Sequence, residues 1–184
     1  MFESKGYQIL DQSKTHYITS TVIDWVDVFT IKIYNEIVID SMKYCIANKG
    51  MILYGFVIMS NQIHLIIQSR NGRLSDLLRD FKKFTAKTIL ETIENGETEN
   101  RKDWMLKRFE FACKSNTRNE QYQFWEHGKT SEAIYTEEYY KKSLEYIYQI
   151  PVKNGIVSKP EDYIYSSASE YIKNKNLIQE FKTN

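Results

Sequence analysis

Two apolar runs separated by a short polar triplet constrain the fold of this 184-residue chain more than any other feature. The runs are Met51–Met59 and Gln62–Gln68, and the triplet is Ser60–Gln62. Polar residues between two such runs predict a β-hairpin. Because both runs are almost continuously apolar, we expect the two strands to be central in a sheet and covered on at least one face. A buried helix would give a similar run, but Gly55 and the polar triplet argue against it.

The segments around this hairpin predict one more strand and several helices. Tyr17–Val22 is rich in β-branched and aromatic residues, which is typical of a strand. Apolar residues at spacings of three and four predict three amphipathic helices. These helices cover Ile31–Asn48, Leu74–Glu94 and Glu137–Gln149. Pro151 and Gly155 are expected to end the last of them.

The remaining segments are less regular. Trp104–Cys113 fits a short helix, or a strand in its second half. Asn95–Asp103 and Lys114–Gln123 are polar and are expected to be loops, and Ser166–Phe181 fits a short helix with a tail. The predicted order is β-α-β-β-α, then irregular segments and a final helix, which begins like a ferredoxin-like (split βαβ) unit.

We therefore predict an α+β fold. It has a ferredoxin-like antiparallel sheet with helices mainly on one face, plus a C-terminal helical segment. The length of 184 residues fits a single domain over 1–184. No run approaches the ~18 unbroken apolar residues of a membrane span. The N-terminal residues lack the pattern of a signal peptide. The two cysteines, Cys45 and Cys113, are too few for a disulfide framework, which favours the reducing cytoplasm.

Charge alone does not identify a partner. The chain has 25 basic and 24 acidic residues, a net charge of +1. The stretch from Arg70 to Arg118 has 12 basic and 8 acidic residues, so it carries a mild basic bias that an ordinary solvated surface would also show. On the predicted helix over Leu74–Glu94, four cations lie largely off the apolar stripe and form a basic face. They are Arg79, Lys82, Lys83 and Lys87.

A few side chains have the chemistry of a functional site. Strand alternation places Gln62 and His64 on one face, where an amide oxygen and an imidazole nitrogen can bind Mg²⁺ or Mn²⁺. A core histidine with satisfied nitrogens is the alternative. The chain has 14 tyrosines, so composition alone singles out none of them. Trp125, beside a polar loop, either stacks on unpaired bases or anchors that loop to the core.

Four segments together, in their order and spacing, form a more specific pattern. They are YGFVIMSNQIHLII at 54–67, LSDLLRDFKKFTAKTI at 74–89, QFWEHG at 123–128 and YIYQIPVKNGIVSKPEDYIYSSASEY at 146–171. In this order they resemble the single-tyrosine HUH transposases, and the REP-associated tyrosine transposase group most of all. The resemblance covers a core of about 17–171. Local motifs for P-loop, dinucleotide-binding, zinc-ribbon or α/β-hydrolase sites are lacking.

The resemblance implies an activity and its residues. In this family a divalent ion, expected here as Mg²⁺ or Mn²⁺, polarises a phosphate of single-stranded or hairpin DNA. A helix tyrosine, here Tyr146, attacks that phosphate and forms a 5′-phosphotyrosine link, as in DNA transposition and recombination. His64 matches the second HUH histidine. Gln62 replaces the first histidine, and Ile150 replaces the third ligand, so Gln149 is expected to stand in for it.

The resemblance also implies partners and leaves two functions open. The basic face on 74–94 and Trp125 would contact DNA, and the protein would be a monomer or a homodimer that does not bind membranes. Because two expected ligands are replaced, the chain is either an active transposase or an inactive protein that binds DNA hairpins. If Tyr146 and His64 act on one phosphate, the Tyr146 hydroxyl should lie within about 10 Å of His64.

Overall fold

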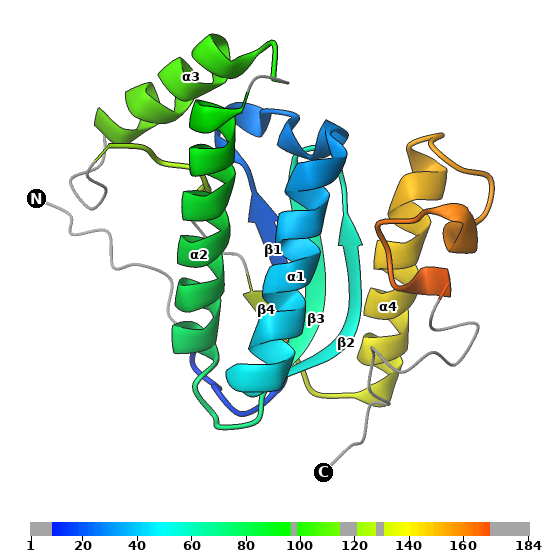
Figure 1. The fold of residues 1–184 in the computed structure, drawn as a ribbon. Coiled ribbons are helices and arrows are strands. Elements are labelled where there is room, and N and C mark those ends of the chain that lie inside the picture. The colour runs from blue at the N-terminus through cyan, green and yellow to red at the C-terminus, as the bar shows by residue number, and fades with distance from the viewer. Residues whose placement is uncertain (1–8, 97–98, 115–120, 128–130, 170–184) are drawn as a thin grey trace, which may run out of the picture.

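The sheet is the centre of the computed structural model, which describes residues 9–96, 99–114, 121–127 and 131–169 (Figure 1). It is antiparallel, has the strand order β2-β3-β1-β4, and is joined to four α-helices. The strands are β1 (Thr15–Thr21), β2 (Met51–Ile58), β3 (Gln62–Ser69) and β4 (Ser131–Ile134). The helices are α1 (Lys32–Asn48), α2 (Leu74–Asn95), α3 (Lys102–Lys114) and α4 (Glu137–Lys153). Short 3₁₀ turns cover Ile23–Trp25 (η1), Val28–Thr30 (η2) and Pro160–Asp162 (η3).

This order of elements confirms the α+β fold predicted from the sequence. From β1 to β4 the chain follows a β-α-β-β-α-β path, which is the ferredoxin-like arrangement, with α3 added before β4. The hairpin of β2 and β3 has the bounds expected to within one residue at each end. Among the described residues, no helix is both long and apolar enough to cross a membrane.

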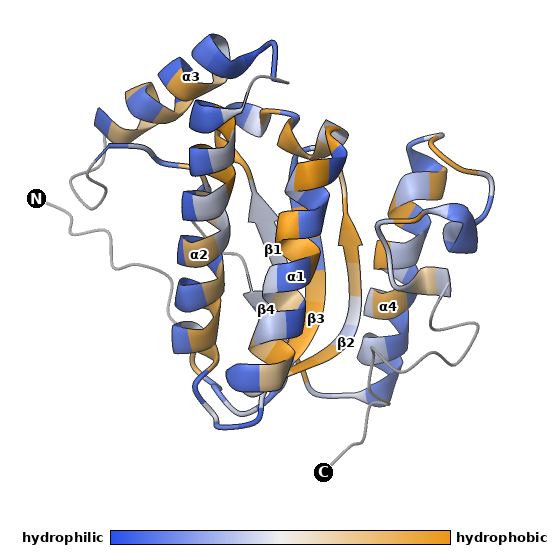
Figure 2. Cartoon of the chain, viewed as in Figure 1, coloured by the Kyte–Doolittle hydropathy of each residue, from blue (hydrophilic) through white to orange (hydrophobic). Residues whose placement is uncertain are grey.

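The sheet separates two apolar cores. The larger core lies between the sheet and helices α1 and α2, and includes Ile18 and Leu65 from the strands. The smaller core lies under α4 on the opposite face and includes Val57 and Ile66. Figure 1 shows α1 and α2 in front of the sheet and α4 at its side, and Figure 2 shows β2 and β3 as the most apolar strands. Burial on both faces explains why these two strands have almost no polar positions.

Residues 165–167 cover the exposed edge of β2. The backbone N–H of Ile58 donates to the carbonyl of Tyr165 at 2.9 Å, and that of Ser167 donates to Phe56 at 3.0 Å. The Ser167 hydroxyl also lies 3.0 Å from the hydroxyl of Tyr148 on α4. The segment therefore pairs an edge that would otherwise be open to another strand, and it ties α4 to the sheet.

Several sequence expectations need correction or fall outside the described residues. The sequence did not indicate β4, whose four residues are too few for a clear alternation. Residues 104–113 are helical throughout, as part of α3. Residues 97–98, 115–120 and 170–184 are not described. Two residues of the first predicted loop, six of the second, and most of the predicted C-terminal helix and tail therefore cannot be compared.

Pro151 does not end α4, contrary to expectation. The helix continues through it to Lys153, and Pro151 is buried in the last turn. A proline lacks its own N–H but still offers a carbonyl, and the Pro151 carbonyl accepts a bond of 2.9 Å from the N–H of Ile156. Gly155, with φ +69°, lies just beyond the helix and is the residue that turns the chain away.

Gly55 lets α4 approach the sheet closely. The strand register shifts between Leu53 and Gly55, which is a β-bulge. A Cβ at Gly55 would lie 2.5 Å from Leu144 Cδ1 and 3.3 Å from Ile147 Cδ1, both on α4. The absence of a side chain here therefore sets the spacing between the sheet and the helix that carries Tyr146.

We expect Gly55→Ala to lower the free energy of unfolding by about 1–3 kcal/mol, because α4 must move or repack. Urea unfolding followed by circular dichroism measures this change. The double variant Gly55→Ala/Leu144→Ala should lose less than the sum of the two single variants, since the shorter side chain makes room for the methyl group. Strict additivity would contradict the predicted close contact.

Candidate functional site

The sheet face under α4 gathers the polar side chains of the candidate site. In the antiparallel pairing of β1 with β3, Thr19 lies opposite His64 and Thr21 lies opposite Gln62. Side chains of directly opposed residues share a face, so these four lie together. The neighbouring β3 residues Ile63 and Leu65 point the other way, into the larger core.

His64 is buried and held by two hydroxyl groups. Its side chain is 5% exposed, and Nδ1 lies 2.8 Å from the Tyr17 hydroxyl and 3.2 Å from the Thr19 hydroxyl. The rings of Tyr17 and His64 are stacked, with centroids 6.0 Å apart. Burial lowers the pKa of His64 to about 4, because the charged imidazolium loses its hydration. His64 is therefore neutral at pH 7, the state in which an imidazole binds metals.

Tyr146 is half exposed and lies beside the same tyrosine. Its ring is 50% exposed and meets the Tyr17 ring edge to face, with centroids 6.3 Å apart. The ammonium group of Lys153, two turns further along α4, lies 5.5 Å from the centroid of the Tyr146 ring. Tyr146 and His64 thus both contact the Tyr17 ring, while the expected separation of about 10 Å between the Tyr146 hydroxyl and His64 stays a prediction.

A carboxylate and another tyrosine complete the surroundings of Tyr17. Glu132 on β4 lies opposite Tyr17 and accepts a hydrogen bond of 2.6 Å from the hydroxyl of Tyr139 on α4. Burial raises the pKa of Tyr17 to about 12, and the charges of Tyr146 and Glu132 add to this shift. Tyr17 therefore keeps its proton at pH 7 and acts as a neutral hydrogen-bonding group.

The predicted metal ligands can be tested against these contacts. The amide nitrogen of Gln62 donates to the Thr21 hydroxyl at 3.1 Å, which leaves the amide oxygen as a donor atom for a cation. For His64, an Nδ1–H group that donates to Tyr17 or Thr19 leaves Nε2 with its lone pair. Gln149 is half-buried on α4, one helical turn after Tyr146. Each of the three thus has a neutral donor atom of the kind that a divalent ion accepts, and their joint binding of an ion stays a prediction.

A neutral set of this kind would hold a cation weakly. Mg²⁺ in proteins usually takes carboxylate oxygens together with phosphate oxygens of a substrate. Within the described part of the chain, no group of three or more His, Cys, Asp or Glu side chains is arranged to hold a metal. Ile150 packs against the smaller core and contributes an apolar contact there. Oxygen atoms of a bound ligand would therefore have to supply part of the coordination.

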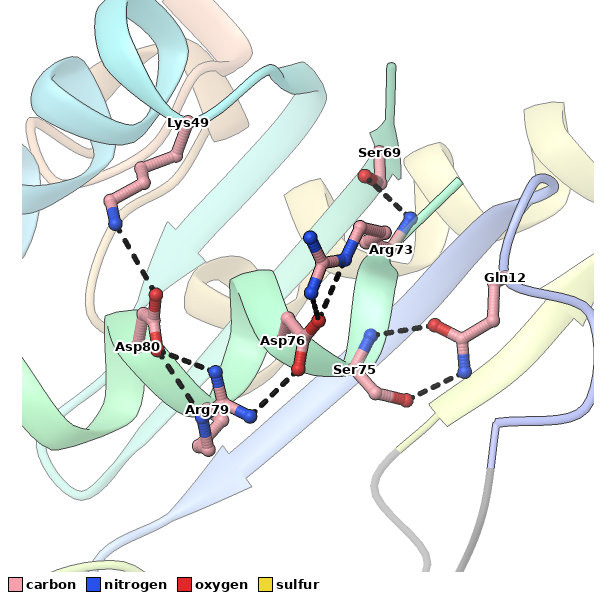
Figure 3. Close-up of polar contacts among 8 residues, drawn as sticks. All are labelled: Gln12, Lys49, Ser69, Arg73, Ser75, Asp76, Arg79 and Asp80. Atoms are coloured by element: carbon pink, nitrogen blue, oxygen red, sulfur yellow. Dashed lines mark hydrogen bonds and ion pairs between the residues drawn. The ribbon is translucent and has the colours of Figure 1, made fainter. Parts of the chain in front are cut away.

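The predicted basic face lies far from this site, because α2 covers the opposite face of the sheet. Arg79 is paired with Asp76 at 2.7 Å and with Asp80 at 3.1 Å, and Asp80 also pairs with Lys49 (Figure 3). The Lys87 ammonium group lies 3.7 Å from Glu91. Neighbouring carboxylates therefore offset the charges of Arg79 and Lys87, two of the four cations of the predicted basic face.

Trp125 is part of the core. It is 6% exposed, its ring stacks on Phe29 at 6.1 Å, and its N–H donates to the Lys82 carbonyl at 3.1 Å. A ring so buried offers no face to a base, so the structure favours the alternative in which this residue anchors its loop. The Lys82 ammonium group lies 5.8 Å from the Trp125 ring centroid, and burial lowers the pKa of Lys82 to about 8.

Sequence reasoning missed four residues of the site. Tyr17 and Thr19 were available from the pattern, because a strand next to β3 must place alternate residues opposite His64. Glu132 depends on β4, which the sequence did not indicate. Lys153 lies seven residues after Tyr146 and therefore on the same side of α4, but it was expected to lie beyond the end of the helix.

Comparisons with known proteins place the fold but not the family. Neither a protein-family model nor a curated protein matches the sequence. Among solved structures, the chain is similar to a REP-associated tyrosine transposase bound to a REP hairpin, with a TM-score of 0.63 and 16% identity. The match covers 100% of this chain and 97% of that chain. At this identity the likeness shows a shared fold.

The buried His64 predicts a pH-dependent stability. The pKa of His64 is about 4 in the folded protein and 6.5 in the unfolded chain. Between pH 6.5 and pH 4, therefore, the unfolded chain binds this proton and the folded protein does not. Stability is fully present above pH 6.5 and falls as the pH drops, by about 3 kcal/mol at pH 4 from this group. Urea unfolding between pH 7 and pH 4 measures the slope.

His64→Gln should flatten this slope, since the replacement does not titrate. An NMR titration of the imidazole Cε1–H gives the pKa directly in the wild type. Equal slopes for the two proteins, or a midpoint near 6.5, would contradict the burial of His64.

Proposed function

We propose that this chain binds a DNA hairpin and cleaves and rejoins single-stranded DNA through Tyr146. The observation that carries the proposal is the half-exposed Tyr146 ring, which lies beside Tyr17. The hydroxyl of Tyr17 in turn holds the buried His64 on the same sheet face. A nucleophile must be reachable by its substrate, whereas groups that orient a metal ligand are usually buried. The shared fold with a transposase bound to a REP hairpin supports DNA as the partner.

The proposed reaction is a balanced exchange of phosphate esters. The Tyr146 hydroxyl loses its proton, its oxygen bonds to phosphorus, and the bond from phosphorus to the 3′ oxygen breaks. The 3′ oxygen takes up a proton, and the 5′ phosphate remains on Tyr146. One phosphodiester is replaced by another, so the reverse reaction rejoins DNA without ATP.

The residues around Tyr146 have distinct roles in this reaction. The Lys153 ammonium group beside the Tyr146 ring attracts the DNA phosphate. Tyr17 and Thr19 fix the orientation of His64. His64, Gln62 and Gln149 would hold a divalent ion, which supplies Lewis-acid polarisation of the phosphate.

A covalent adduct on a denaturing gel tests this proposal. The protein is incubated with labelled hairpin DNA from its own flanking sequence, with Mg²⁺ or Mn²⁺ added. We expect an adduct that Tyr146→Phe abolishes while hairpin affinity stays within about twofold. Tyr44→Phe, a similarly exposed tyrosine on α1 across the sheet, is the control and should keep the adduct. An adduct that persists in Tyr146→Phe would refute the proposal.

A second candidate function is hairpin binding without cleavage. Its support is the neutral ligand set, in which Gln62 stands where the resembling family has a histidine. In this case the wild type would bind the hairpin with the same affinity with and without metal, and would form no adduct with either ion.

The substitution Gln62→His tests the proposed ligand role without relying on activity. A second imidazole should tighten Mn²⁺ binding at least about tenfold by isothermal titration calorimetry, because imidazole is a better ligand for this ion than an amide oxygen. Gln68→His, on the same strand and the same face, is the control and should not tighten binding. Equal Mn²⁺ affinities for wild type and Gln62→His would remove Gln62 from the metal site.

A further inference from the structure

Helix α3 is an addition to the β-α-β-β-α-β path, and its outer side carries exposed aromatic rings. The helix packs on α2 and η1 through an inner side that includes Met105 and Phe109, both fully buried. On the outer side, the Trp104 ring is 49% exposed and the Phe111 ring is 73% exposed. Large aromatic side chains this accessible contribute nothing to the apolar core and call for another explanation.

A cation lies between these two rings. Trp104, Arg108 and Phe111 are spaced by four and three residues, so they form one row along the helix, called here the α3 stripe. The Arg108 guanidinium group lies 5.9 Å from the Trp104 ring centroid. The stripe therefore alternates aromatic, cationic and aromatic groups over about 10 Å of helix.

A third exposed ring lies next to the stripe. Asp24 and Trp25 in η1 have φ values of 52° and 55°, which non-glycine residues rarely adopt, and the Trp25 ring is 59% exposed. Arg108 reaches Asp24 at 3.7 Å and so links the stripe to this turn. The Asn61 amide group donates to the Trp25 carbonyl at 3.2 Å and holds the turn in place. A strained backbone that displays an indole ring is typical of a functional surface.

The charge on α3 indicates the kind of partner. The helix has four cationic and two acidic side chains, a net charge of +2. A purely apolar partner would be poorly matched to rings with cations among them. Unpaired bases suit it, because each base has an aromatic face and each nucleotide carries an anionic phosphate.

We propose that Trp25 and the α3 stripe form a stacking surface for unpaired bases of single-stranded DNA. The stripe is long enough for about three bases at a spacing of 3.4 Å. In Figure 1, α3 lies at the far side of the molecule from α4, so this surface is separate from Tyr146. It shares with the proposed function only the class of ligand, and it stands whether or not Tyr146 reacts.

Fluorescence anisotropy with a labelled, unstructured 20-nucleotide oligo-dT tests the surface. The wild type should bind it with an affinity that falls as salt rises. Trp104→Ala/Phe111→Ala should weaken binding about tenfold or more, since each ring stacks on a base. The control Tyr44→Ala/Phe84→Ala removes two rings that are each 56% exposed on α1 and α2, and should bind within twofold of the wild type.

Circular dichroism melting shows whether each variant is folded. The single variant Phe111→Ala should still bind oligo-dT measurably more weakly than the wild type. The proposal is overturned if the wild type does not bind oligo-dT, or if Trp104→Ala/Phe111→Ala binds as well as the wild type. If the wild type does not bind oligo-dT but self-associates in sedimentation, and Trp104→Ala/Phe111→Ala does not self-associate, the surface is a protein interface instead.

The hairpin adduct separates the two proposals. If the adduct forms normally in Trp104→Ala/Phe111→Ala while oligo-dT binding falls, both proposals are supported. If the wild type forms no adduct, and Trp104→Ala/Phe111→Ala binds oligo-dT more weakly than the wild type, the stacking surface stands and cleavage by Tyr146 fails.

Discussion

The antiparallel pairing of β1 with β3 is the interaction on which the rest of the structure depends. It joins the hairpin of β2 and β3 to β4 and so makes one sheet from all four strands. Its register, with Thr19 opposite His64, places Tyr17 and Thr19 within hydrogen-bonding distance of Nδ1. A slip of one residue would send these side chains into the larger core, where their hydroxyl groups would lack partners. The apolar residues of the larger core and the polar residues of the candidate site therefore fix the same register.

The candidate site combines buried orienting groups with an accessible tyrosine, the proposed nucleophile. His64 is neutral because burial lowers its pKa, and Tyr17 stays protonated because burial raises its pKa. Tyr146 lies on the solvent side of the same cluster, on a helix whose distance from the sheet is set by Gly55. The ligands that would hold a cation are all neutral, which makes the site weaker than one with two imidazoles or a carboxylate.

The two sides of the sheet have different relations to DNA in these proposals. Under α4 lies the site where a phosphate would react, with Lys153 as the nearby cation. On the other side, Arg79 and Lys87 of α2 are paired with carboxylates, and the added helix α3 displays exposed rings beside Arg108. Exposed aromatic rings, more than the basic residues of α2, mark the second surface that would contact nucleic acid.

The sequence by itself determined the elements that depend on local patterns. Two apolar runs with a polar triplet specified β2 and β3, and spacings of three and four specified α1, α2 and most of α4, because these periods come from backbone geometry. It also placed Gln62 and His64 on one face. The tertiary structure decided what depends on packing between distant segments. It extended α4 through Pro151, formed β4 from four residues, buried Trp125 and brought Tyr17 between β3 and α4, since only contacts across the sheet compensate for weak local preference.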